Sequence, residues 1–172
     1  YGCNNLDRAS PPLIEGKDGA FFRLKLDFRM NQPLSTGAAG LIGDMAAALR
    51  ELGTELIYVP VPTKSLAMPD RVPDGVDSYG FDMEVAEVAY DAFLGKLTDA
   101  GVTTVDTMRA MREADGAPFQ LTDFHWSPEG ARAVAGALGE TIRAMPDYDD
   151  LEKTGYETEA TEVEPMDSRL RT

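Results

Sequence analysis

The sequence predicts an α/β domain in which a parallel β-sheet carries helices on both faces. Helical and strand-like segments alternate through residues 35–146, and such alternation is typical of parallel strands joined by crossover helices. Residues 54–61 are a nearly uninterrupted run of strand formers, as expected for a strand buried on both faces. With 172 residues and 43% hydrophobic side chains, the chain is large enough to form one domain with its own core.

Composition divides the chain into three parts. Residues 1–34 are rich in turn-forming residues around one apolar run, so we predict an irregular segment with a short strand at residues 19–24. Residues 35–146 form the predicted α/β core. Residues 147–172 contain nine acidic and three basic residues with little periodicity, which predicts an acidic tail or a linker.

The first half of the core is predicted to contain one helix and one strand. Ser35 and Thr36 can cap a helix, and Gly53 can end it near residue 52. The expected apolar stripe of this helix contains Leu41, Ile42, Met45, Ala48, Leu49 and Leu52. The strand at residues 54–61 follows, and Pro60 should interrupt its pairing because proline has no N–H group.

The second half of the core continues the alternation. It is predicted to contain a helix, a strand, a helix, a strand and a helix at residues 82–100, 102–106, 107–114, 119–122 and 128–145. The stripe of the first of these helices contains Val85, Val88, Ala89, Ala92, Phe93 and Leu97. Ser127 reads as the N-cap of the last helix, with Pro128 in its first turn.

The strongest candidate for a functional motif is the segment 122–130. It contains His125, the only histidine of the chain, two residues after Asp123. In extended backbone this spacing puts both side chains on one side. A carboxylate beside an imidazole can orient the ring and stabilise its charged form, as a general base for a hydroxyl nucleophile requires. The alternative is a packed, structural histidine beside Trp126.

Loops at the carboxyl ends of three predicted strands contain polar residues. They carry Thr63 and Lys64, Asp106, and the pair Asp123 and His125. Functional loops gather at this edge of parallel sheets, so the positions favour a common site.

Several classes of partner are disfavoured. The net charge of −14 argues against nucleic acid and anionic membrane surfaces. No apolar run reaches the 18 residues expected of a membrane span. One histidine and one cysteine are too few for an ordinary zinc site, and no cofactor is indicated.

Four further features can be compared with known families: residues 19–23 with Asp27 and Arg29, residues 56–64, residues 123–131 and residues 140–146. In these segments the chain resembles the alginate O-acetyltransferase group of AlgX/AlgJ type, within the SGNH-hydrolase-like superfamily. The resemblance implies an SGNH-like fold and a Ser-His-Asp catalytic set, in which His125 is the base and Asp123 its orienting partner.

The resemblance also implies a nucleophilic serine in a glycine-flanked turn, downstream of the histidine. None of the six serines matches it; they are Ser10, Ser35, Ser65, Ser78, Ser127 and Ser168. We therefore expect the nucleophile outside this chain, in a downstream segment or a complementary chain. The alternative is a complete but inactive protein. A periplasmic or secreted location is expected, where Cys3 could pair with a downstream cysteine.

The implied reaction is transfer of acetyl from a donor to hydroxyl groups of an alginate-like exopolysaccharide. Lys64, Thr63 and Trp126 are predicted to contact this substrate, with Lys64 facing its carboxylate; a solvated lysine is the alternative. Two other functions stay open, namely an SGNH-type carbohydrate esterase and an inactive carbohydrate-binding or scaffold module.

Overall fold

The computed structural model describes residues 13–31 and 34–160. Helices are α1 (Leu24–Asp27), α2 (Thr36–Glu51), α3 (Lys64–Ala67), α4 (Met83–Asp99), α5 (Thr107–Arg112) and α6 (Pro128–Arg143). Strands are β1 (Leu13–Glu15), β2 (Phe21–Arg23), β3 (Ile57–Tyr58) and β4 (Thr103–Thr104), and short 3-10 turns are η2 (Lys17–Gly19), η3 (Pro69–Arg71), η4 (Val76–Tyr79) and η5 (Tyr148–Asp150). Expectations for Cys3, Ser10, Ser168 and the end of the acidic tail lie outside the described residues.

The three long helices begin and end within about two residues of their predicted limits. The Ser35 hydroxyl accepts a hydrogen bond from the Ala38 N–H at 3.0 Å and so caps α2. Asp82 caps α4 in the same way, through the Val85 N–H at 3.1 Å. Beyond the ends of these two helices, Gly53 and Gly101 have φ values of 76° and 80°, a conformation that favours glycine. Local sequence therefore determines these boundaries.

The strands are shorter than predicted. β3 and β4 form a two-stranded parallel ladder, in which Ile57 pairs with Thr103 and Tyr58 pairs with Thr104. The absent N–H of Pro60 agrees with the early end of β3. At the other end of the molecule, β1 and β2 pair antiparallel, although residues 13–15 were predicted to be coil.

The predicted third parallel strand at residues 119–122 is wrong. This segment makes one isolated antiparallel bridge, between Phe119 and Trp126. Its main chain closes a tight loop instead, because the Gln120 N–H donates to the His125 carbonyl at 3.0 Å and the Ser127 N–H donates to the Pro118 carbonyl at 3.0 Å. Although its residues favour strands, this segment is one arm of a hairpin-like loop that folds back on residues 125–127.

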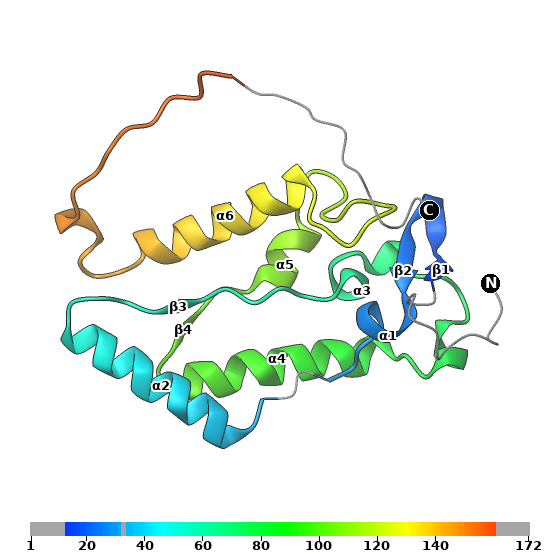
Figure 1. Cartoon of the computed structure of the whole chain (residues 1–172), viewed down its shortest axis with the longest axis horizontal. Helices are drawn as coiled ribbons and strands as arrows, with labels where there is room; N and C mark the ends of the chain where they lie inside the picture. The colour runs from blue at the N-terminus through cyan, green and yellow to red at the C-terminus, as the bar shows by residue number, and fades with distance from the viewer. Residues whose placement is uncertain (1–12, 32–33, 161–172) are drawn as a thin grey trace.

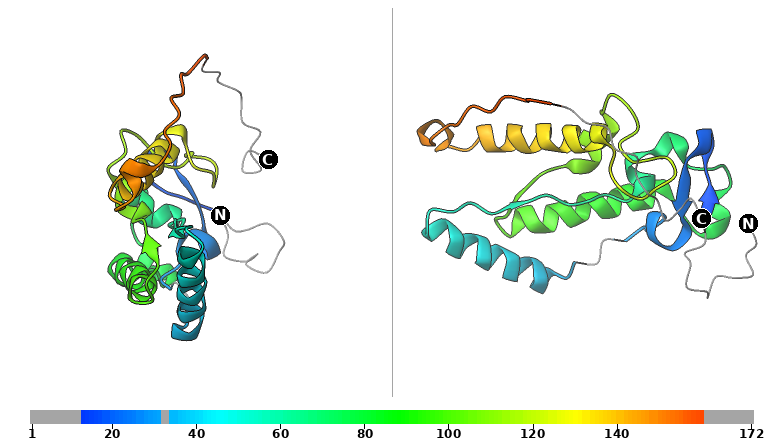
Figure 2. Two further views of the ribbon diagram at one scale, coloured as in Figure 1. Left: turned by 90° about the vertical axis from the view of Figure 1, so that its left-hand side faces the viewer. Right: turned by 45° about the horizontal axis from the view of Figure 1, so that its top comes forward.

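The elements form layers around the parallel ladder. β3 and β4 run between α6 on one side and the pair α2 and α4 on the other (Figures 1 and 2). The antiparallel strands, α1 and α3 gather at one end of the molecule (Figure 1). In the described part of the chain, no helix combines the length and hydrophobicity needed to cross a bilayer.

The apolar stripes predicted for α2 and α4 are only partly buried. The large side chains of Leu41, Leu52 and Val88 are 72%, 80% and 64% exposed. The buried residues of α2 are Ala39, Gly43 and Ala46, which are small. Small side chains let the helix approach its neighbour closely, so the buried face is the one that fits rather than the most apolar one.

Replacing Gly43 by alanine is expected to lower the free energy of unfolding by about 2–3 kcal/mol. A Cβ atom at this position would lie 2.3 Å from the main-chain oxygen of Ala100, so α2 and α4 would have to move apart. Gly40→Ala is the matched control, because no atom lies within 4 Å of its Cβ position. It should stabilise α2 by up to about 1 kcal/mol. Chemical denaturation measures the free energy of unfolding of both variants. Equal changes in Gly43→Ala and Gly40→Ala would contradict the close contact between α2 and Ala100.

Candidate active site

Asp123 and His125 are in direct contact. The Asp123 Oδ1 atom lies 2.7 Å from Nδ1 of the imidazole. The same oxygen accepts hydrogen bonds from the main-chain N–H groups of Phe124 at 2.5 Å and His125 at 3.0 Å. The contact is thus made in a turn organised by the aspartate, not in the extended strand that the spacing suggested.

The carboxylate of the pair is buried, and the imidazole is open to solvent. The side chain of Asp123 is 3% exposed, whereas that of His125 is 55% exposed. An ionised carboxylate only accepts hydrogen bonds, so the contact favours a proton on Nδ1 and leaves Nε2 as the basic nitrogen. No hydrogen bond joins Nε2 to any of the residues that the structure describes. The ring can therefore exchange a proton with a group arriving from outside.

Phe124 packs beside the imidazole, and Arg23 packs on the Phe124 ring. The ring centroids of Phe124 and His125 are 4.2 Å apart, and the guanidinium carbon of Arg23 lies 4.6 Å from the Phe124 centroid. Asp27, which is buried, accepts two hydrogen bonds from the Arg23 side chain, at 2.8 and 3.2 Å. Residues of β2 and α1 thus support the loop that carries His125. In the sequence, only the spacing of four residues between Arg23 and Asp27 could have indicated this ion pair.

The structure corrects the predicted place of Lys64. It is 1% exposed, at the start of α3, so neither the substrate contact nor the solvated lysine of the prediction fits. Its Nζ atom donates to the main-chain oxygens of Phe21, Gln120, Leu121 and Asp123, at 2.6–2.9 Å. Burial lowers the pKa of Lys64 to about 8, while the charges of Asp27 and Asp123 act in the opposite direction.

Thr63 and Trp126, also predicted to bind substrate, have contacts within the protein. The Thr63 hydroxyl caps α3 by accepting from the Leu66 N–H at 3.4 Å. Trp126 is partly buried against the cluster of Ala67, Met68, Met111, Phe119 and Val134. Asp106 caps α5 through the Arg109 N–H at 3.1 Å and pairs with the Arg109 side chain. These contacts stabilise the fold, and contact with substrate stays a prediction for Thr63 and Trp126.

Each of the four serines in the described part of the chain is engaged elsewhere. Ser127 donates to the Ala117 carbonyl at 2.5 Å and accepts from the Gly130 N–H at 3.0 Å, as the predicted N-cap of α6. Ser65 donates to the main-chain oxygen of Asp27. Ser35 caps α2, and Ser78 donates to the Gly75 carbonyl at 2.7 Å. None of these four hydroxyls is hydrogen-bonded to the imidazole.

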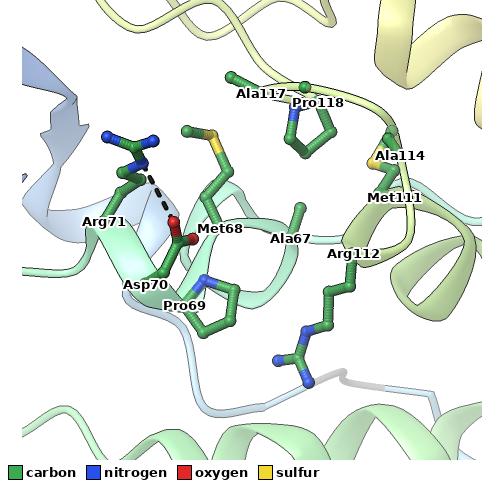
Figure 3. Close-up of a pocket in the computed structure, with 11 residues that line it drawn as sticks. Ala67, Met68, Pro69, Asp70, Arg71, Met111, Arg112, Ala114, Ala117 and Pro118 are labelled. Atoms are coloured by element: carbon green, nitrogen blue, oxygen red, sulfur yellow. Dashed lines mark ion pairs between the residues drawn. The ribbon is translucent and has the colours of Figure 1, made fainter. Parts of the chain in front are cut away.

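A cavity of about 410 Å³ lies between α3, η3 and the loop after α5 (Figure 3). Neither Asp123 nor His125 lines it. Its two arginines are already paired, because Arg71 contacts Asp70 and Arg112 contacts Glu87. Across the described ranges, no cluster of three His, Cys, Asp or Glu side chains is arranged to hold a metal ion. The acid–base pair is therefore the candidate centre.

Comparison with known proteins identifies the family. The model of the SGNH hydrolase-like domain of the acetyltransferase AlgX matches residues 13–171. The chain belongs to this AlgX family. The AlgX family assignment also supports the predicted SGNH-like fold, although the described part of the chain contains only the two-stranded parallel ladder rather than a larger sheet.

Individual relatives agree with the assignment to the AlgX family. The alginate biosynthesis protein AlgX of Pseudomonas aeruginosa is 27% identical over 147 residues, which are 85% of this chain and 31% of that protein. The probable alginate O-acetylase AlgJ of the same organism is 31% identical over 140 residues, covering 77% of this chain and 34% of that protein. The chain thus spans about a third of the length of these relatives.

Solved structures show the same similarity in three dimensions. A structure of P. aeruginosa AlgX matches 82% of this chain with a TM-score of 0.69 and 27% identity, and the match covers 34% of that protein chain. The O-acetyltransferase domain of Pseudomonas putida AlgJ matches 78% of this chain with a TM-score of 0.60 at 24% identity, and the match covers 48% of that domain's chain. The second match bears on the fold alone.

Proposed function

We propose that this chain supplies the acid–base half of a Ser-His-Asp centre that acetylates hydroxyl groups of an alginate-like polysaccharide. The observation that carries the proposal is the 2.7 Å contact between a buried carboxylate and an exposed imidazole. The names of the AlgX and AlgJ relatives supply the reaction and the polymer. A periplasmic or secreted location is part of the proposal.

The proposed reaction has two steps. Nε2 of His125 takes the proton of a serine hydroxyl as its oxygen attacks the acetyl carbonyl of the donor, and the donor's leaving group departs with that proton. In the second step a sugar hydroxyl attacks the acetyl-serine ester. His125 takes the proton of the sugar hydroxyl and returns it to the serine as the acetylated sugar leaves. Asp123 keeps the ring oriented and stabilises the imidazolium in both steps.

The nucleophilic serine of this scheme lies outside the chain. Support comes from the four described serines, each of which has a structural hydrogen bond, and from the absence of a glycine-flanked serine turn in the sequence. A downstream segment or a complementary chain would bring the serine to the exposed edge of His125. An oxyanion-stabilising group would come with it.

Acetyl partitioning between sugar and water tests the proposal. The full-length natural protein is incubated with 4-nitrophenyl acetate and mannuronate oligomers, and acetylated oligomer is counted by mass spectrometry against free acetate. Transfer to the oligomer that is lost in His125→Gln is the expected result. Acetate release without acetylated oligomer would indicate the esterase instead. Oligomer binding with neither product would indicate the inactive binding module.

A further inference from the structure

The ammonium group of Lys64 joins two segments that are far apart in sequence. One acceptor, the Phe21 carbonyl, belongs to β2, at 2.9 Å. The other three are the carbonyls of Gln120, Leu121 and Asp123, at 2.6, 2.8 and 2.9 Å. The Phe21 N–H also donates to the Leu121 carbonyl, at 2.7 Å. Lys64 therefore holds the loop 120–123 against β2.

Asp123 connects Lys64 to the imidazole of His125. The main-chain carbonyl of Asp123 accepts from Lys64, and the carboxylate of the same residue contacts Nδ1 of His125. A shift of the Asp123 main chain would move its carboxylate, because the side chain has only two rotatable bonds. The orientation of the ring is thus linked to the position of the ammonium group.

The carbonyl cluster is best matched by a positively charged donor. An ammonium group has three N–H bonds to share among the four carbonyls, a neutral amine has only two, and an apolar side chain would leave the buried carbonyls without this donor. The charged groups that face Lys64 are Asp27 of α1, Asp123 of the loop and Arg23 of β2. Two carboxylates against one guanidinium leave the surroundings net negative, which favours the ammonium form.

We propose that Lys64 is a positioning residue of the acid–base pair, whose ammonium fixes the main chain of residues 120–123 and thereby aims the Asp123 carboxylate at His125. The inference depends on the proposed function only for the catalytic meaning of the pair. The linkage itself is a property of this loop and can be measured without acetyl transfer.

The test compares Lys64→Met with the wild type in the full-length natural protein. The ¹⁵N shifts of the His125 imidazole, assigned by their loss in His125→Gln, report which ring nitrogen carries the proton. In the wild type the Nδ1–H form should dominate, and in Lys64→Met its share should fall towards that of a free imidazole. Turnover of 4-nitrophenyl acetate should fall by about 10²-fold in kcat. KM should stay within about twofold.

A matched control separates positioning from general loss of stability. Leu97 is fully buried in another cluster, formed with Ala46 and Val102. Leu97→Ala should lower Tm comparably while leaving the imidazole signals and kcat unchanged. If Lys64→Met kept the wild-type imidazole signals, or if Leu97→Ala changed them equally, Lys64 would be an ordinary core residue.

A second measurement uses the wild type alone and holds even if Lys64→Met fails to fold. Burial places the pKa of Lys64 near 8, so its ammonium is present at pH 7 and is lost as the pH rises through that value. The amide signals of Asp123 and His125 should shift with the same midpoint as the Lys64 side chain. Amide signals that ignore the lysine titration would overturn the proposal. A protein that shows the linkage but transfers no acetyl would overturn only the proposed function.

Discussion

His125→Ala is expected to reduce acetyl transfer by about 10⁶-fold in kcat, the loss found on removing the base of a Ser-His-Asp centre. The imidazole is the only one in this chain. Because its side chain is 55% exposed, truncation should leave the free energy of unfolding nearly unchanged. Initial rates and chemical denaturation on the same preparation measure both quantities.

Asp123→Asn should reduce kcat for acetyl transfer by about 10⁴-fold, by a different route. An asparagine amide that turns its NH₂ towards Nδ1 makes that nitrogen an acceptor, which moves the ring proton to Nε2 and removes the base. Asp106→Asn is the matched control, since the Asp106 carboxylate likewise accepts a hydrogen bond from a main-chain N–H group, as the N-cap of α5, but contacts Arg109 rather than the imidazole. Transfer at wild-type rates by either His125→Ala or Asp123→Asn would remove the proposed mechanism.

Gly130→Ala is expected to destabilise the protein by about 3 kcal/mol and to reduce acetyl transfer as well. A Cβ atom at Gly130 would lie 2.1 Å from the main-chain oxygen of Pro118, which also accepts from the Ser127 N–H. The first turn of α6 would be forced away from the loop that carries Asp123 and His125. Unfolding free energy and kcat should therefore fall together.

Gly136→Ala is the control for this variant. It lies in the same helix with no atom within 4 Å of its Cβ position, so it should raise helix stability by up to about 1 kcal/mol and leave transfer unchanged. If Gly130→Ala proved as harmless as Gly136→Ala, the close approach of α6 to the loop would not exist in solution.

The loop around His125 shows how far local sequence goes at this site. The cap at Ser127, the proline in the first turn of α6 and the contact between residues 123 and 125 all follow from short-range chemistry. The backbone form did not follow, because residues 119–122 are strand formers that find no parallel partner in the described chain and fold back on residues 125–127. Whether a strand pairs depends on segments that are distant in sequence, and the strand propensity of its own residues carries no information about them.

Lys64 illustrates the opposite limit. A lysine after Pro62 and Thr63 has no local feature that predicts burial, and long charged side chains are rarely buried. Its position is fixed by carbonyls that lie 43 to 59 residues away in sequence. These oxygens come together only when β2 and the loop 120–123 pack on α3, so no pattern within the segment could reveal the contact.

The sequence by itself determined the three long helices α2, α4 and α6, the proximity of Asp123 to His125, and the resemblance to the AlgX family. Each depends on residues a few positions apart or on a recognisable motif. The tertiary structure decided which strands pair, which face of α2 is buried, and that Lys64 lies beneath the acid–base loop. Those outcomes depend on packing between distant segments, where the size of a side chain and the availability of a partner outweigh its intrinsic preference.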